Sequence, residues 1–81
     1  MPRYRFNVWT GTELIRDDEG DELPDFEAAL FEARMSMREL AIECLRSGQD
    51  MSQQYIEIAD ELGTRLGLVR IEDVASFDTA H

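Results

Sequence analysis

The amino-acid sequence predicts an α+β domain with the element order β-β-α-β-β, in which one long helix packs on an antiparallel sheet of about four strands. Three observations predict this class. Residues 3–9 alternate polar and apolar side chains, as a half-buried strand does. Residues 26–46 contain no Gly or Pro and consist largely of strong helix formers. Residues 55–59 and 65–71 are short, rich in aliphatic side chains, and separated by an acidic turn.

The first strand, residues 3–9, begins a hairpin. Residues 10–12, Thr-Gly-Thr, form its turn, and residues 13–16 form the returning strand. An acidic turn that ends in Gly20 follows, and residues 21–23 continue as a short extended piece.

The helix covers about residues 25–47. Asp25 is a good N-cap, because its carboxylate can accept a hydrogen bond from a free backbone N–H of the first turn. Gly48 ends the helix, since glycine readily takes the left-handed conformation that helix ends require.

The helix has an inner apolar stripe that should cover the sheet. At about 100° per residue its members share one face. They are Phe26, Leu30, Ala33, Met37, Leu40, Ala41 and Cys44. The sheet residues expected to face this stripe are Tyr4, Phe6, Val8, Ile56, Ile58, Leu66 and Leu68.

A second group of apolar residues, the outer stripe, lies on the opposite side of the helix and consists of Phe31, Met35 and Ile42. Arg34 and Arg38 flank it on one edge, and glutamates flank it on the other. Isolated apolar residues on a surface are common and need no special role. We favour instead a homodimer in which two helices meet along this stripe, because so small a chain gains stability from a partner surface.

The composition limits the classes of partner. The chain has 81 residues, 18 acidic and 8 basic, and a net charge of −10. Nucleic acids and anionic membranes bind clustered cations, so both are disfavoured as partners. No apolar run is long enough for a secretion signal or a membrane span, and a cytoplasmic location is expected. We expect one domain over residues 1–75 and a frayed tail over residues 76–81.

Residues suited to catalysis or metal binding are scarce. The only histidine, His81, ends the chain, and the only cysteine, Cys44, lies in the inner stripe. The acidic turn at residues 17–22 lacks the spacing of a calcium-binding loop, and the glycines form no phosphate-binding loop. We therefore predict no catalytic, cofactor or metal site and no enzyme activity.

The outer face of the sheet offers another possible surface. Arg3, Arg5, Trp9 and Tyr55 should point away from the helix. Arginine and aromatic side chains on a sheet are typical of proteins that stack single-stranded RNA. The alternative is that Arg3 or Arg5 pairs with Glu57 on the neighbouring strand while Trp9 covers the sheet edge, and the net charge favours this alternative.

The order of several short motifs resembles an uncharacterised family of short bacterial proteins. The motifs are Pro2-Arg3-Tyr4-Arg5-Phe6, Asp17-Asp18-Glu19-Gly20, Glu22-Leu23-Pro24-Asp25, the Ala28-Ala29 start of the helix, and Ile58-Ala59-Asp60-Glu61-Leu62-Gly63. The resemblance covers about residues 2–74. It implies the fold and a bacterial source, and it brings no activity.

The first function hypothesis is a small non-catalytic interaction or regulatory module, a homodimer through the outer stripe. The alternative is an acidic protein that sequesters a basic partner, since the strand, acidic turn, strand and helix resemble small antitoxins with a partial ribonuclease-H-like sheet. A short basic open reading frame beside this one would favour the alternative. The strand order, and whether the outer stripe binds itself or another protein, stay open at this point.

Overall fold

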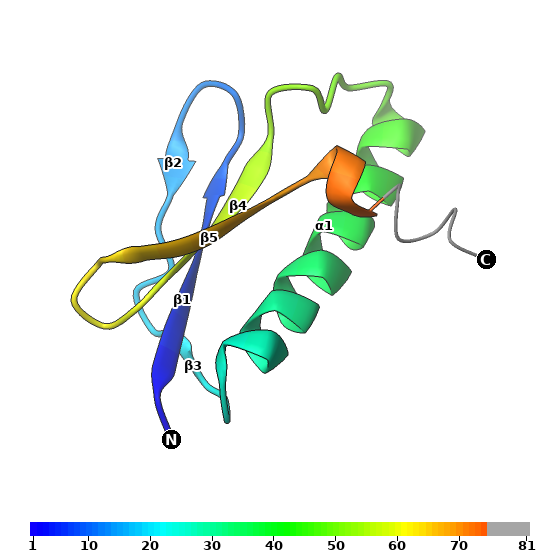
Figure 1. The fold of residues 1–81 in the computed structure, drawn as a ribbon. Helices are drawn as coiled ribbons and strands as arrows, with labels where there is room; N and C mark the ends of the chain where they lie inside the picture. Colours follow the sequence, from blue (N-terminus) through cyan, green and yellow to red (C-terminus); the bar gives the residue numbers. More distant parts are fainter. Residues whose placement is uncertain (75–81) are drawn as a thin grey trace.

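One antiparallel sheet is covered on one side by one long helix in the computed structural model, which describes residues 1–74 (Figure 1). The elements are β1 (Arg3–Trp9), β2 (Leu14–Ile15), β3 (Asp21–Glu22), α1 (Phe26–Ser47), β4 (Tyr55–Ala59) and β5 (Arg65–Arg70). The strand order is β2-β1-β4-β5, and β3 also pairs with β1. The predicted α+β class is confirmed.

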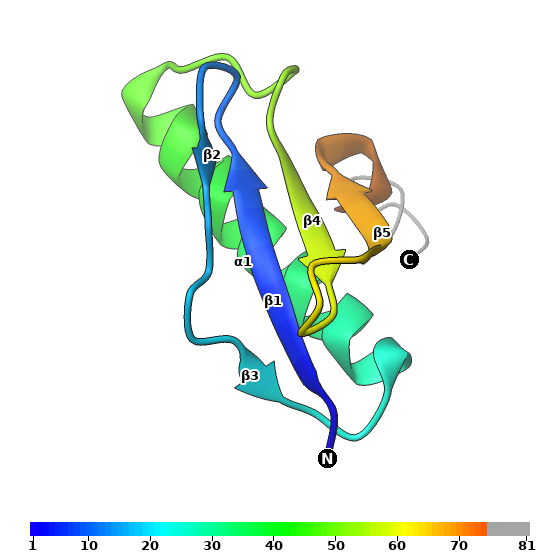
Figure 2. The same ribbon diagram turned by 90° about the vertical axis from the view of Figure 1, so that its left-hand side faces the viewer.

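The two short strands β2 and β3 share one edge of β1 (Figure 2). The predicted returning strand of residues 13–16 is shorter than expected, because the chain turns away at Asp17. The Asp17 carboxylate accepts hydrogen bonds from the backbone N–H groups of Phe6 and Gly20. This side chain therefore takes the place of strand pairing and leads the chain from β2 into β3.

Helix α1 has the expected ends. The Asp25 carboxylate accepts a hydrogen bond of 2.9 Å from the backbone N–H of Ala28. At the other end Gly48 is left-handed, and its N–H binds the carbonyl oxygen of Cys44. These caps satisfy backbone groups that have no partner inside the helix, so the short-range signals in the sequence place both ends.

The inner stripe of α1 packs on β4 and β5. Its buried members are Ala33, Met37 and Cys44, and Ala29, which was not placed in the stripe, is buried beside them. The prediction that Leu66 and Leu68 face the helix is wrong. A bulge between Ile58 and Ala59 shifts the register of β5, so that Val69 is 1% exposed and Leu66 is 42% exposed. Because successive side chains of a strand point to opposite faces, such a shift exchanges the two faces.

Residues 71–74 form one helical turn after β5. The Asp73 carboxylate accepts a hydrogen bond from the backbone N–H of Arg70, and Val74 is buried. Residue 75, the last of the predicted domain, and the predicted tail, residues 76–81 with His81, lie outside the described residues.

Candidate functional site

The outer stripe lies on the exposed side of α1, as predicted. Phe31 is 57%, Met35 40% and Ile42 52% exposed. Leu45, which the sequence analysis did not include, is 83% exposed and follows Ile42 by three residues. From Phe31 to Leu45 the apolar positions are separated by four, seven and three residues. This spacing continues the same helix face. Once Leu45 is included, Arg38 lies within the face and not at its edge as expected, at the one position that is not apolar.

The two arginines of the stripe differ in their surroundings. The Arg34 Nε atom is buried and makes no hydrogen bond within residues 1–74. The Arg38 side chain is exposed and takes part in an interaction inside the chain. Arg34 therefore borders the stripe with a guanidinium group that has no acidic partner in the described residues.

The predicted outer sheet face brings Trp9 and Tyr55 together as cross-strand neighbours. Their ring centroids are 6.4 Å apart with an interplanar angle of 30°. The Arg70 guanidinium lies over the Tyr55 ring, 5.4 Å from its centroid. Arg3 pairs with Glu22 at 3.1 Å, at the far end of β1. Each of these side chains therefore already contacts another residue of the same chain.

A hydrogen-bonded network that was not predicted from the sequence crosses the centre of the same face. The Asn7 amide nitrogen donates to Glu57 Oε1 at 2.9 Å, and Arg65 Nε donates to Glu57 Oε2 at 2.9 Å. The Asn7 carbonyl oxygen accepts a hydrogen bond from the backbone N–H of Asp17. Glu57 is thus paired with Asn7 and Arg65, and the expected pairing with Arg3 or Arg5 is wrong.

These two hydrogen bonds lower the pKa of Glu57 from its ordinary value, and the bond from Asn7 is the larger cause. The same contact with Glu57 raises the pKa of Arg65. Both groups therefore stay charged near neutral pH. A carboxyl group used as a general acid needs a raised pKa, so the direction of the shift suits a structural role for Glu57.

Beside this network, Arg5 and Arg16 line a polar hollow of about 250 Å³. The Arg5 Nε atom is buried without a hydrogen bond in the described residues. Asp18 and Glu61 line the same hollow, so its walls carry charges of both signs. The alternation of side chains along residues 3–9 predicted that Arg5 lies on this face. The position of the loop that supplies Arg16 and Asp18 is known only from the structure.

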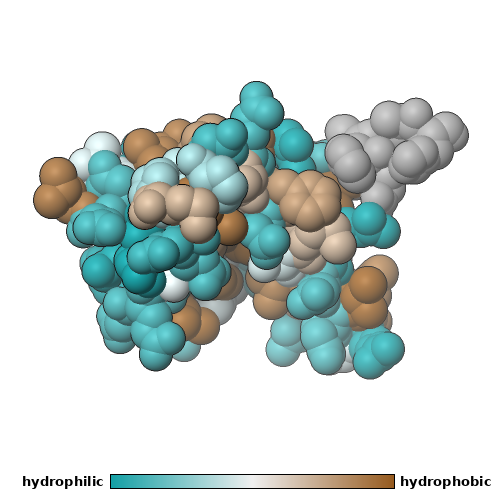
Figure 3. Space-filling model, turned by 90° about the horizontal axis from the view of Figure 1, so that it is seen from below, coloured by the Kyte–Doolittle hydropathy of each residue, from teal (hydrophilic) through white to brown (hydrophobic). Residues whose placement is uncertain are grey.

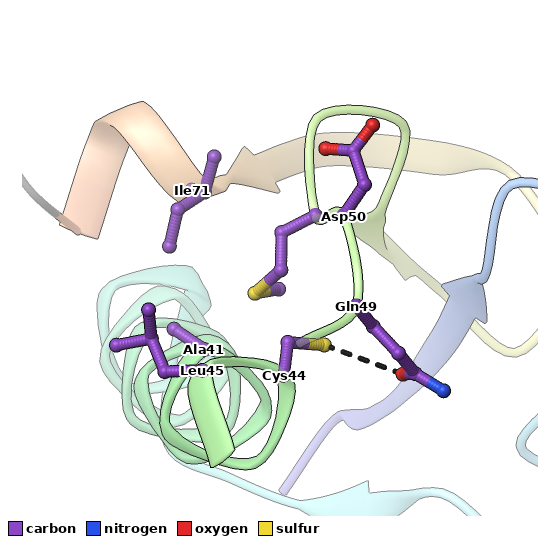
Figure 4. A pocket seen from close by; sticks show the side chains of 7 residues that line it. Ala41, Cys44, Leu45, Gln49, Asp50 and Ile71 are labelled. Carbon is purple, nitrogen blue, oxygen red and sulfur yellow. Dashed lines mark hydrogen bonds between the residues drawn. The ribbon is translucent and has the colours of Figure 1, made fainter. Parts of the chain in front are cut away.

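Cys44 lies at the wall of an apolar hollow of about 300 Å³, between the end of α1 and the turn that contains Ile71 (Figure 4). The thiol is 4% exposed and lies 3.7 Å from Gln49 Oε1. Leu45 and Met51 line the other sides. No histidine is present in residues 1–74 to activate the thiol, and the predicted packing role of Cys44 fits this setting.

Residues 1–74 hold no cluster of three or more side chains of the types that ligate metals. Within the same residues, no helix combines the length and apolar character that crossing a bilayer requires.

One of these features could have been found from the sequence. Leu45 lies inside the predicted helix and continues the spacing of the outer stripe. Asn7 and Glu57 occupy outward positions on β1 and β4, which pair in the structure. Their pairing follows only from the register between the strands, which the sequence alone left open.

Comparison with known proteins gives one match. The profile of a family described as Domain of unknown function (DUF6894) matches residues 3–72. No curated protein and no solved structure matches the chain. The predicted resemblance to an uncharacterised family is confirmed.

Proposed function

Since the chain belongs to the family DUF6894, a domain of unknown function, we propose that it is a small non-catalytic interaction module, and that two copies associate through the outer stripe of α1. The observation that carries the proposal is the exposure of Phe31, Met35 and Ile42 on one helix face. Large apolar side chains gathered on one surface are typical of protein–protein contacts.

The spacing of the stripe suits a helix pair. Phe31, Met35, Arg38, Ile42 and Leu45 alternate spacings of four and three residues, the repeat by which two helices interlock. Arg38 occupies the middle of this repeat. A charged residue at such a position lowers the stability of the pair and fixes its register.

The charges beside the stripe support two copies that run parallel. In a parallel pair related by a twofold axis, one edge of the stripe faces the opposite edge of the mate. Arg34 and Glu39 lie on opposite edges, five residues apart, which is the offset at which such flanking residues meet. The twofold axis would then form two Arg34–Glu39 pairs, and Arg34 would gain the acidic partner that residues 1–74 do not supply.

We propose a non-catalytic module because two of its carboxylates and its thiol serve the fold. Asp17 and Glu57 each accept two hydrogen bonds within the chain, and those to Glu57 lower its pKa. Cys44 is 4% exposed. We place the module in the cytoplasm, where a single free thiol stays reduced.

The first experiment measures molecular mass by light scattering during size exclusion, at tens of micromolar protein. The wild-type chain should be a dimer. Met35→Arg should be a monomer with an unchanged circular dichroism spectrum, because Met35 is 40% exposed and its replacement buries no charge in the core. In a dimer, the new arginine would be buried only where the two outer stripes meet, and a buried unpaired charge there opposes association.

The matched control is Leu62→Arg, which adds the same charge at a residue that is 91% exposed in the turn between β4 and β5. This variant should remain a dimer. A wild-type chain that is monomeric at this concentration, or a Met35→Arg chain as dimeric as the wild type, would refute the dimer.

A second candidate is an acidic protein that sequesters a basic partner. The observation that favours it is the excess of acids, 18 against 8 arginines. Exposed ion pairs are screened by salt, so a basic partner captured from native lysate in low salt should be lost when the salt is raised. A partner retained equally in high salt would argue against this candidate.

A further inference from the structure

Helix α1 leaves part of the sheet uncovered. It packs mainly on β4 and β5 and crosses behind the sheet diagonally (Figure 2). Val8 of β1 is only partly buried. Ile15 pairs with Val8, so it shares the helix-facing side, yet it is 52% exposed. Seen from below, the molecule is notched between the sheet, to the left, and α1, to the right (Figure 3).

Two adjoining hollows form a groove along this uncovered strip. One, of about 330 Å³, is lined by Val8, Leu40 and Ile56. The other, of about 590 Å³, extends from Leu40 to the turn of the β1–β2 hairpin. They meet at Leu40 and Glu43, which line both. We call the two together the hairpin groove; its lining is apolar at one end and of mixed polarity at the other.

The rim of the hairpin groove carries charge of one sign. Glu39 and Glu43 border it on α1, Glu13 on the hairpin, and Asp50 on the loop after the helix. None of the eight arginines lines either hollow. Hydrogen bonds from the backbone N–H and the hydroxyl of Ser52 lower the pKa of Asp50, so this group stays ionised. A groove with acids alone on its rim concentrates cations.

We propose that the hairpin groove binds a basic amphipathic helix of a partner protein. Its apolar side would lie on Val8, Leu40 and Ile56, and its lysines or arginines would face Glu13, Glu43 and Asp50. This deepens the interaction role proposed above and does not require the dimer.

A helix suits the groove because α1 already occupies the same layer. A second helix can lie beside the first at the usual separation of about 8–10 Å and cover the rest of the sheet. A basic partner is favoured over a second copy of the chain, since another copy would bring a further net charge of −10 to an acidic rim.

The test titrates the full chain with a fluorescent leucine–lysine amphipathic helix in low salt, followed by anisotropy. The double variant Glu13→Gln/Glu43→Gln should weaken binding about tenfold, since each exposed ion pair contributes a modest amount. Ile15→Ser should weaken it about threefold by removing an exposed apolar side chain that pairs with Val8 next to the groove. Backbone amide signals of Val8, Ile15 and Leu40 should shift in NMR spectra on binding.

The matched controls are Glu61→Gln and Leu62→Ser, which make the same kinds of change in the turn between β4 and β5. Both should bind the peptide within about twofold of the wild type. Equal losses in the groove and control variants, or no binding by the wild type, would overturn the proposal. So would loss of the wild-type dimer in Ile15→Ser but not in Met35→Arg, because a second copy would then occupy the groove. A monomeric wild type that still binds the peptide would refute the dimer alone.

Discussion

Asn7 joins three segments of the chain through a single side chain. It is 6% exposed, and it bonds Glu57 on β4 with its amide nitrogen and the Asp17 backbone with its carbonyl oxygen. A buried polar group is costly unless its hydrogen bonds are made. Both ends of Asn7 are satisfied, so this residue fixes the loop after β2 against the outer face of the sheet.

Glu57 should make the stability of the protein depend on pH. Its pKa in the folded chain lies below the ordinary value of 4.5. A carboxyl group with a lowered pKa contributes stability that is fully present above its unfolded pKa and is lost as the pH falls through the folded value. Glu57→Gln should therefore lower the free energy of unfolding by about 1–2 kcal/mol at neutral pH. The difference from the wild type should narrow below pH 4.5.

Urea unfolding at neutral pH and at about pH 3 measures this difference, and the wild type should lose more stability than the variant on acidification. Glu61→Gln serves as the control, because Glu61 is exposed and makes no hydrogen bond through its side chain in the described residues. It should change stability by less than about 0.5 kcal/mol. A gap between wild type and Glu57→Gln that is the same at both pH values would contradict the account.

At the scale of elements, the connection between β2 and β3 depends on Gly20. Its φ angle is 72°, a left-handed value that glycine tolerates best. An added Cβ atom would lie 2.8 Å from the carbonyl oxygen of Tyr4. This oxygen belongs to β1 and cannot move without disturbing the sheet, so the turn can lie this close to β1 only with glycine.

Gly20→Ala should consequently destabilise the fold more than Gly63→Ala does. Gly63 has a similar φ of 86°, but an added Cβ would meet nothing within 4 Å. Both variants should lose about 1–2 kcal/mol from backbone strain, and Gly20→Ala should lose at least 1 kcal/mol more from the close contact. Thermal and urea unfolding of the two variants measure this difference. Equal losses would mean that the backbone oxygen gives way.

The bulge in the β4–β5 hairpin and Gly67 together decide how α1 meets β5. The bulge turns Val69 toward the helix, and Gly67 lies under Phe26, where an added Cβ would stand 3.0 Å from the ring. Glycine weakens a strand because it has no side chain to pack, but at Gly67 this lack of a side chain lets the first turn of α1 approach β5. Local propensity and close packing act in opposite directions at this residue.

At the scale of the whole molecule, α1 is apolar on two sides and the sheet covers only one of them. The outer stripe is exposed at every apolar position from Phe31 to Leu45. Small domains bury a limited share of their surface, so a partner surface adds stability that a thin core lacks. In a dimer, folding and association are then coupled.

This coupling predicts that stability depends on protein concentration. For the wild type, a tenfold rise in concentration should add about 1.4 kcal/mol to the free energy of unfolding per dimer. Met35→Arg should show no such dependence, and at low concentration the two proteins should approach the same midpoint. Thermal unfolding over a hundredfold range of protein concentration measures how the midpoint depends on concentration. A wild-type midpoint that stays constant over this range would count against coupled folding.

Short-range signals in the sequence were enough to place most elements. The alternation of residues 3–9 predicted β1, and the residue types at Asp25 and Gly48 predicted both ends of α1. These features depend on neighbours within a few residues, where backbone preference and capping act. The exposure of the outer stripe was predictable for the same reason, since helical periodicity is a local property.

The contacts between distant segments were not predictable in this way. The bulge reversed the faces of Leu66, Leu68 and Val69, and the pairing of Glu57 with Asn7 and Arg65 replaced the expected pairing with Arg3 or Arg5. Both depend on strand register, and a shift of one residue exchanges the faces of a strand without changing its composition. The hairpin groove has the same origin, because the placement of α1 over β4 and β5 follows from packing between segments far apart in the chain. Local sequence thus accounts for the elements and the outer stripe, whereas long-range packing sets the polar network and the acidic groove.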